Sequence, residues 1–299
     1  MEWESEIKEF KTYLKFEKGL SENSIEAYLA DLQKLTQFLK EKDYNLKPED
    51  INLSHLMELL EYETKKGISS RTQARIISAI KSFYKYLLIE EKIEKDPSAL
   101  LESPKIGRKL PDTLSIEEID AIIGAVDTSK PEGQRNRAIL ETLYSCGLRV
   151  SELINMKISN LFFESGFIKV EGKGSKERLA PISNKAIKEI NLYLSEYRRT
   201  LKISKSDEDI LFLNRRGQKL TRVMVFTIIK DLMKLVNIHK NVSPHTFRHS
   251  FATHLIDGGA NLKAVQEMLG HESIITTEIY THLDKEYLRN TIVQFHPRS

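Results

Sequence analysis

Apolar residues recur at helical spacing through the first hundred residues of the chain. Ile7, Phe10 and Leu14 mark one amphipathic helix, which Gly19 ends. The next segment carries a longer apolar stripe, formed by Ile25, Tyr28, Leu29, Leu32, Leu35 and Leu39. A shorter helix is expected over residues 53–65, and Gly67 separates it from a fourth.

The fourth predicted helix has two different faces. It opens with a capping box formed by Ser70 and Gln73. At 100° per residue one arc is apolar, with Ile76, Ile77, Ile80, Phe83, Tyr84, Leu87 and Leu88. The adjoining arc is basic, with Arg71, Arg75, Lys81 and Lys85. Taken alone, such an arc is more typical of a solvated surface than of a face laid along phosphates.

A segment rich in proline divides the chain. The stretch "DPSALLESPKIGRKLPDTLS" breaks the helical pattern, and a second capping box, Ser115 with Glu118, starts a new helix. We therefore expect a helical domain over residues 1–95, a linker over 96–114 and a second domain over 115–299.

The second domain combines helices with a short region of strand character. Helical patterns cover residues 116–126, 134–145, 184–199 and 221–236, and they continue to the end with a break at "DGGAN". Between them, "LFFESGFIKVEGKGSKERLAPIS" has turn signals at 164–166 and 172–175, which predict three short antiparallel strands. The predicted fold is mainly α with a small antiparallel β-sheet, in two domains of which the second is α+β.

Composition narrows the class of protein. With 40% hydrophobic and 30% charged residues, the chain is typical of a folded globular protein and not of a disordered one. It has no apolar run of the roughly 20 residues that cross a membrane, and its N-terminus "MEWESEIKEF" is acidic, so we expect a cytosolic protein. The single cysteine, Cys146, lies in an apolar run and is interpreted as a small buried residue. A net charge of +3 permits a nucleic-acid partner without requiring one.

The segment "SPHTFRHSFATHL" has two histidines four residues apart, His245 and His249, as a helical zinc site would. The hydrolytic version of that site needs a glutamate directly after the first histidine, where Thr246 stands. Arg248 would also repel a dication from the same face. We reject the metal interpretation.

The same segment fits a phosphate site better. Ser243 is a good N-cap and Pro244 suits the first helical position, so His245 lies in the first turn, where free backbone N–H groups attract anions. Arg248 shares its face, and both are expected on the exposed side, opposite Phe247, Phe251 and Leu255. His249 and His254 are assigned structural roles.

Further segments carry residues of the same chemical types. "CGLRVSEL" presents Arg149, "EGKGSKER" places Lys173 in a Gly-x-Gly turn, and "LGHESIITTEIYTHL" contains His271 and Tyr280. Each has an ordinary structural explanation when taken alone.

Together, the ordered motifs "GLRVSEL", "GKGSKER", "SPHTFRHSFATHL", "LGHESIITTEIYTHL" and "HPRS" resemble those of the tyrosine recombinases, the phage integrase family, and specifically its Xer branch. The resemblance extends over essentially the whole chain. It implies that Tyr280 is the nucleophile, surrounded at the scissile phosphate by Arg149, Lys173, His245, Arg248 and His271. It also implies that Glu152 holds Arg149 in place.

The resemblance further implies a site-specific recombinase that breaks and rejoins DNA through a 3′-phosphotyrosyl link, resolving chromosome dimers at a specific site. Such an enzyme needs neither metal nor cofactor, because arginines supply the positive charge and the tyrosyl link keeps the energy of the broken bond. The implied partners are double-stranded DNA, a homo- or hetero-tetramer with another recombinase, onto which the C-terminal helix packs, and a DNA translocase. In this context Arg71, Arg75, Lys81 and Lys85 become candidate DNA contacts.

Three other functions stay open at this point. A recombinase of a mobile element would use the same chemistry, and a relaxing topoisomerase would cut and reseal one strand without paired sites. A DNA-binding protein without catalysis is the alternative from another class.

Overall fold

The computed structural model describes residues 2–105, 113–172, 177–270 and 282–298. These residues form two compact units, 1–109 and 110–299, each with its own hydrophobic core. Among them, no helix is long and apolar enough to cross a membrane.

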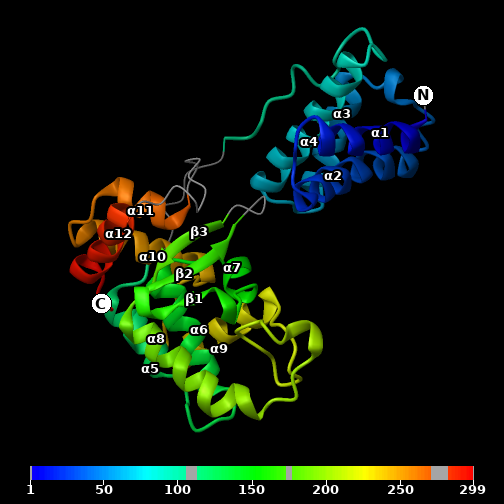
Figure 1. Cartoon of the computed structure of the whole chain (residues 1–299). Coiled ribbons are helices and arrows are strands. Elements are labelled where there is room, and N and C mark those ends of the chain that lie inside the picture. Colours follow the sequence, from blue (N-terminus) through cyan, green and yellow to red (C-terminus); the bar gives the residue numbers. More distant parts are fainter. Residues whose placement is uncertain (1, 106–112, 173–176, 271–281, 299) are drawn as a thin grey trace. The chain divides into compact units, whose positions relative to one another are not determined.

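The first unit is a bundle of helices (Figure 1). Its described residues form four α-helices, α1 (Trp3–Phe16), α2 (Glu22–Glu41), α3 (Leu53–Lys65) and α4 (Ser70–Ile89), and a short 3-10 helix at Pro48–Asp50. The apolar stripes meet in one core, in which Phe10, Leu32 and Phe83 are fully buried. The helices predicted for this part of the chain are confirmed.

The start of α4 differs from the prediction by one residue. Its N-cap is Ser69, whose hydroxyl accepts a hydrogen bond of 3.2 Å from the backbone N–H of Thr72. Ser70 is already the first helical residue, so it cannot cap, and the predicted Ser70–Gln73 box is wrong. The apolar arc also shifts at its end: Tyr86 is buried, and Leu88 is 40% exposed.

Both ends of the predicted linker pack onto a unit. Leu101 is buried in the core of the first unit, and Leu114 is buried in that of the second. The backbone N–H of Leu114 donates to the Ser250 hydroxyl at 2.9 Å. Ser115 and Glu118 form the predicted capping box of the next helix, which is confirmed.

The elements of the second unit pack around one helix, Gly133–Cys146, most of whose residues are buried. These elements are α5 (Ile116–Gly124), α6 (Gly133–Cys146), α7 (Val150–Ile154), β1 (Leu161–Phe162), β2 (Phe167–Glu171), β3 (Glu177–Pro181), α8 (Asn184–Leu192), α9 (Arg222–Leu235), α10 (Pro244–Asp257), α11 (Leu262–Leu269) and α12 (His282–Phe295). The strands form one antiparallel sheet in the order β1-β2-β3, with Ile168 opposite Ala180. The predicted fold class is confirmed, although the α-helix expected over 184–199 ends at Leu192 and continues as a π-helix, Tyr193–Tyr197.

The single cysteine, Cys146, is the last residue of the buried helix α6. Ile139, Leu143 and Tyr144 are fully buried, and Cys146 at its end is 1% exposed. Burial raises the pKa of the Cys146 thiol, which therefore stays protonated. Its assignment as a small buried residue is confirmed.

The C-terminal helix packs on its own chain. Leu288 and Ile292 of α12 are buried in the core of the second unit. Beyond the helix, Arg298 forms ion pairs with Asp120 at 2.6 Å and Glu141 at 3.2 Å. The expected packing of this helix on a neighbouring protomer stays a prediction.

Candidate active site

A sharp turn after α6 positions the first predicted arginine. Gly147 ends the helix with a left-handed backbone, φ +57°, and a Cβ there would lie 2.5 Å from the Phe251 ring, so only glycine fits. The chain then extends through Arg149, the N-cap of α7. The Arg149 backbone N–H donates to Glu152 Oε2 at 2.8 Å, which fixes the carboxylate at the start of this helix.

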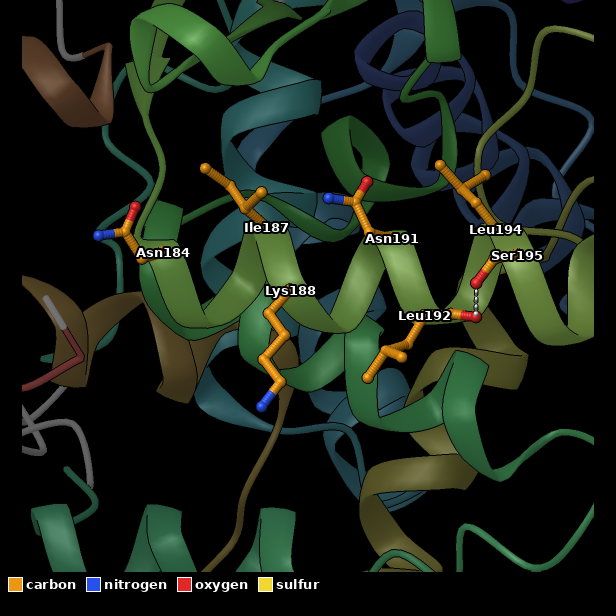
Figure 2. Close-up of a pocket in the computed structure, with 7 residues that line it drawn as sticks. All are labelled: Asn184, Ile187, Lys188, Asn191, Leu192, Leu194 and Ser195. Atoms are coloured by element: carbon orange, nitrogen blue, oxygen red, sulfur yellow. Dashed lines mark hydrogen bonds between the residues drawn. The ribbon is translucent and has the colours of Figure 1, made fainter.

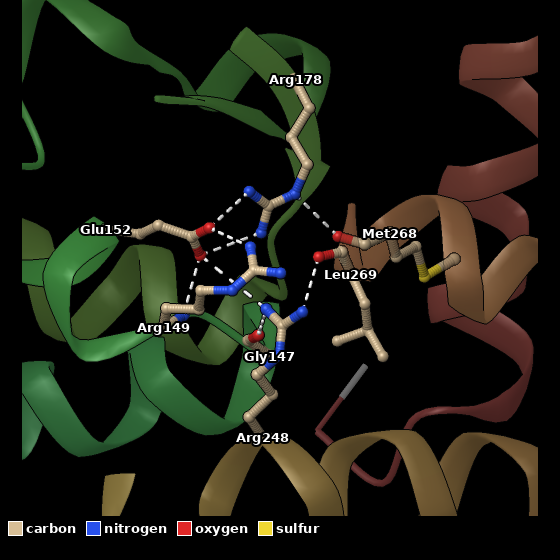
Figure 3. A network of polar contacts seen from close by, with 7 residues as sticks. All are labelled: Gly147, Arg149, Glu152, Arg178, Arg248, Met268 and Leu269. Atoms are coloured by element: carbon tan, nitrogen blue, oxygen red, sulfur yellow. Dashed lines mark hydrogen bonds and ion pairs between the residues drawn. The ribbon is translucent and has the colours of Figure 1, made fainter. Parts of the chain in front are cut away.

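Glu152 is the centre of a polar cluster, the Glu152 cluster, formed with Arg149, Arg178 and Arg248 (Figure 3). Arg178 reaches it from β3 as a planar fork, with Nη1 donating to Oε1 at 2.9 Å and Nη2 donating to Oε2 at 3.1 Å. Arg149 Nη1 donates to Oε1 at 2.8 Å. Oε1 therefore accepts from two guanidiniums, and Oε2 accepts from one guanidinium and one backbone N–H.

Arg248 enters the cluster from α10. Its Nη1 donates to the Gly147 carbonyl at 2.8 Å and its Nη2 to the Leu269 carbonyl at 2.6 Å, and Nη1 lies 3.8 Å from Glu152 Oε2. The side chain is 5% exposed, so the expectation that Arg248 lies on the exposed side of its helix is wrong. The physical reason is that the turn after α6, helix α7 and the end of α11 meet α10 here. The Gly147 and Leu269 carbonyls and the Glu152 carboxylate compensate the buried charge.

The charges in the cluster do not balance. Burial alone would raise the pKa of Glu152, but hydrogen bonds from Arg178 and then Arg149 outweigh it and lower the pKa, so the carboxylate is ionised. Burial, together with the charge of Arg149, lowers the pKa of Arg248 to about 10, which leaves it protonated at neutral pH. One negative charge faces three positive charges, an excess suited to an anion.

Only one of the three arginines is open to solvent. The side chain of Arg149 is 39% exposed, whereas those of Arg178 and Arg248 are 8% and 5% exposed. One side-chain nitrogen of Arg149 donates to Glu152. A guanidinium has five N–H donors, so Arg149 has donors left for a ligand. An incoming anion would therefore meet Arg149 first.

The predicted phosphate helix forms as expected at its start. Ser243 caps α10 in a capping box with Thr246, and Pro244 is the first helical residue. His245 follows in the first turn with an exposed side chain, one turn before Arg248. His254 Nδ1 is hydrogen-bonded to the Tyr144 hydroxyl at 2.7 Å, which gives it the structural role assigned to it, and His249 is half-buried.

The structure thus brings together Arg149, Glu152 and Arg248 of the predicted site. Lys173, His271 and Tyr280 lie outside the described residues. Within the described parts of the chain, no group of three or more His, Cys, Asp or Glu side chains is placed to hold a metal ion.

Sequence reasoning missed Arg178, although it ends the motif "GKGSKER". It lies opposite Val170 in the β2–β3 ladder, and both side chains are buried. An arginine on the apolar face of a predicted strand needs a buried acid, and that requirement was the available signal.

The four basic residues of the predicted arc on α4 differ in their contacts. Arg75 forks onto buried Asp31, with Nε 2.9 Å from Oδ2 and Nη2 donating to Oδ1 at 3.1 Å. Lys81 Nζ donates to the Ala99 carbonyl at 3.4 Å. Arg71 and Lys85 are exposed.

A hollow of about 820 Å³ also lies along α8 and the π-helix that follows it (Figure 2). Asn184, Ile187, Lys188, Asn191, Leu192, Leu194 and Ser195 line it. It contains neither an acid nor a histidine, and none of the predicted catalytic residues lines it, so it is separate from the Glu152 cluster.

Comparison with known proteins identifies the family. Residues 112–287 match the phage integrase family, and residues 7–91 match the N-terminal SAM-like domain of phage integrases. The tyrosine recombinase XerD of Staphylococcus haemolyticus is 43% identical over 99% of this chain and 100% of its own length. The chain belongs to the phage integrase family. It is a tyrosine recombinase of the Xer type, an enzyme of site-specific recombination.

Solved structures of a site-specific recombinase and of a transposon integrase share the fold. The XerH site-specific recombinase, bound to a palindromic difH substrate in a post-cleavage complex, is 26% identical with a TM-score of 0.70, over 95% of this chain and 83% of that one. The Tn1549 transposon integrase in complex with circular intermediate DNA is 21% identical with a TM-score of 0.71, over 93% of this chain and 95% of that one, which shows the common fold.

Proposed function

We propose that this tyrosine recombinase cleaves and rejoins double-stranded DNA at a specific site, with Tyr280 as the nucleophile of a 3′-phosphotyrosyl intermediate. The observation that carries the proposal is the excess of guanidinium charge around Glu152, with Arg149 turned toward solvent. A phosphodiester is the anion that this family binds and cleaves.

Each proposed role answers one difficulty of the reaction. Attack by a phenol places further negative charge on the non-bridging phosphate oxygens, and Arg149 and Arg248 would stabilise it with His271 as a third donor. Lys173 would protonate the leaving 5′ oxygen, and His245 would exchange the tyrosine proton. Glu152 would hold Arg149 without touching the phosphate, since its oxygens already accept from Arg149 and Arg178.

The proposed assembly is a tetramer on two DNA sites. Curated relatives at 42–43% identity are named XerD, and the ending "HPRS" also favours the XerD type, so we propose a hetero-tetramer with a second recombinase. Its proposed task is the resolution of chromosome dimers, assisted by a DNA translocase, in the cytoplasm at the nucleoid. Arg71 and Lys85 are the members of the basic arc best placed to contact DNA, since both are exposed and Arg75 is paired with Asp31.

Covalent trapping tests the proposal. A nicked duplex that carries a candidate site releases a short strand after cleavage, so the phosphotyrosyl adduct accumulates and is seen by denaturing electrophoresis. We expect an adduct with the wild type and none with Tyr280→Phe. An adduct with Tyr280→Phe, or none with the wild type on any genomic dimer-resolution site, contradicts the mechanism. Relaxation of supercoiled DNA without recombination of paired sites would indicate a topoisomerase instead.

A further inference from the structure

We propose that Arg178 is a positioning residue for DNA cleavage, which acts by holding Glu152 and the end of α11 so that Arg149 keeps its outward donors for the phosphate. The inference rests on the proposed function and extends it to a residue outside the set that contacts the phosphate.

Each of the three guanidinium nitrogens of Arg178 donates to an acceptor within the protein. Nη1 and Nη2 donate to the two oxygens of Glu152, and Nε donates to the Met268 carbonyl at 3.0 Å. The side chain is 8% exposed, against 39% for Arg149. Arg178 therefore serves its neighbours in the protein, whereas Arg149 has donors left for a ligand.

The fork of Arg178 determines how Glu152 can hold Arg149. With Arg178 in place, Oε1 accepts from Arg178 and Arg149, and Oε2 accepts from Arg178 and the Arg149 backbone. Two acceptor sites per oxygen are thereby occupied, and Glu152 cannot take a second donor from the Arg149 side chain. Without the fork, the buried carboxylate would draw further Arg149 donors inward to complete its hydrogen bonds.

Arg178 also fixes the end of α11. It holds the Met268 carbonyl while Arg248 holds the Leu269 carbonyl, so two arginines of the cluster bind consecutive carbonyls of this helix end. A Cβ on Gly270 would lie 3.0 Å from Arg178 Cδ, which shows how closely the arginine stem packs there. His271 follows directly in the sequence. One side chain thus links β3, the Glu152 carboxylate and the residue before His271.

A lysine cannot make the three contacts that Arg178 makes. An ammonium is a point charge on a flexible stem, and it cannot donate in one plane to both Glu152 oxygens and to the Met268 carbonyl. Arg178→Lys therefore keeps the charge and removes the fork. We expect the single-turnover cleavage rate at saturating nicked duplex to fall about 10- to 100-fold, the range expected for a displaced catalytic group. The affinity for the duplex should stay within about twofold, because the phosphate contacts of the surface are retained.

The decisive comparison repeats the Arg178→Lys change in a protein that already carries Arg149→Lys. If Arg178 acts through Arg149, Arg178→Lys should cost less than about threefold in an Arg149→Lys background, because coupled residues are not additive. A purely structural role predicts the same fold-loss in both backgrounds. Equal losses, or no loss in the wild-type background, overturn the inference; a wild type that forms no adduct overturns the proposed function and this inference with it.

Two further variants keep the test independent of folding. Arg135→Lys is the matched control: Arg135 is 4% exposed, lies in the same unit and donates to the Leu213 carbonyl, with no contact to Glu152. We expect it to lower the unfolding midpoint and leave the cleavage rate within twofold. If Arg178→Lys does not fold, Glu152→Asp withdraws the carboxylate from the fork at constant charge. It should show the same dependence on the Arg149 background, and additive losses there also contradict the inference.

Discussion

In each unit an arginine contacts a buried carboxylate through two of its nitrogens. In the second unit, further arginines join this contact. In the first unit Arg75 forks onto Asp31, and Lys34 lies 3.3 Å away. In the second unit Arg178 forks onto Glu152 through Nη1 and Nη2, and Arg149 and Arg248 join it. Both carboxylate side chains are at most 1% exposed.

We infer a different role for each arrangement: the Asp31 contacts hold two helices together, and the Glu152 cluster binds an anion. Asp31 joins α2 to α4, and the basic groups on it are half-exposed or near the surface, where their charges are screened. Around Glu152, two of the guanidiniums are nearly buried, where positive charge is weakly screened and costly without an anion. The fork itself stabilises either unit, whereas the two additional arginines, exposed Arg149 and buried Arg248, are the ones that we propose bind a phosphate.

The largest expected effect comes from Glu152→Gln. Removing the charge of the buried acid leaves the three guanidiniums without their counterion, which should destabilise the second unit by about 3–5 kcal/mol at neutral pH. The pKa of Glu152 is lowered in the folded state, so its stabilisation is present above the unfolded pKa of about 4.3 and is lost as the pH falls through the folded pKa. Calorimetry of wild type and variant should show their difference shrinking from pH 6 to pH 3. A constant difference would mean that folding does not lower the pKa of Glu152.

Arg149→Ala should have the next largest effect, and on catalysis. Loss of one donor to the transition state costs about 10²–10³-fold in rate, so single-turnover cleavage of the nicked duplex should fall by that factor. The unfolding midpoint should change little, because the side chain is partly exposed and Arg178 still holds Glu152. A rate within tenfold of the wild type would remove Arg149 from the phosphate site.

Lys173→Ala tests whether charge or proton transfer limits cleavage. We expect a loss of about 10²-fold on ordinary DNA, since a general acid typically contributes that much. With sulfur in place of the bridging 5′ oxygen, the leaving thiolate needs no proton, and the variant should approach the wild-type rate. Equal defects on both substrates would make Lys173 another charge of the cluster rather than an acid.

Asp31→Asn, the matching change in the first unit, should have the smallest effect. It removes the charge-assisted bonds from Arg75 but leaves no buried charge, so the first unit should lose about 1–2 kcal/mol of stability. The cleavage rate at saturating DNA should stay within about twofold. A hundredfold slower cleavage would show that the Arg75–Asp31 pair also serves catalysis.

Local patterns predicted the helices and the sheet, because helix faces, caps and turns are set by residues close in sequence. The apolar stripe of α2 and the Ser115–Glu118 box are of this kind. The error at Ser69 arose because two adjacent serines can both cap, and only the path of the chain after Gly67 selects one.

The site was predicted less completely, because its contacts join distant segments. Arg149 and Arg248 carry recognisable motifs, but the burial of Arg248 depends on carbonyls of Gly147 and Leu269, far from it in sequence. Arg178 and Glu152 are 26 residues apart and on different elements, so no local pattern pairs them. The pairing follows only when β3 is seen beside α7.

The most direct test asks whether the excess charge around Glu152 acts on the charge of the scissile phosphate. The cleavage rates of wild type and Arg149→Ala are measured on a normal nicked duplex and on one with a methylphosphonate at the scissile position, which has no negative charge to neutralise. We predict that the ratio of the two rates, about 10²–10³ on the phosphate, falls at least tenfold on the methylphosphonate. The same ratio on both substrates would contradict the assignment of this cluster as the phosphate site.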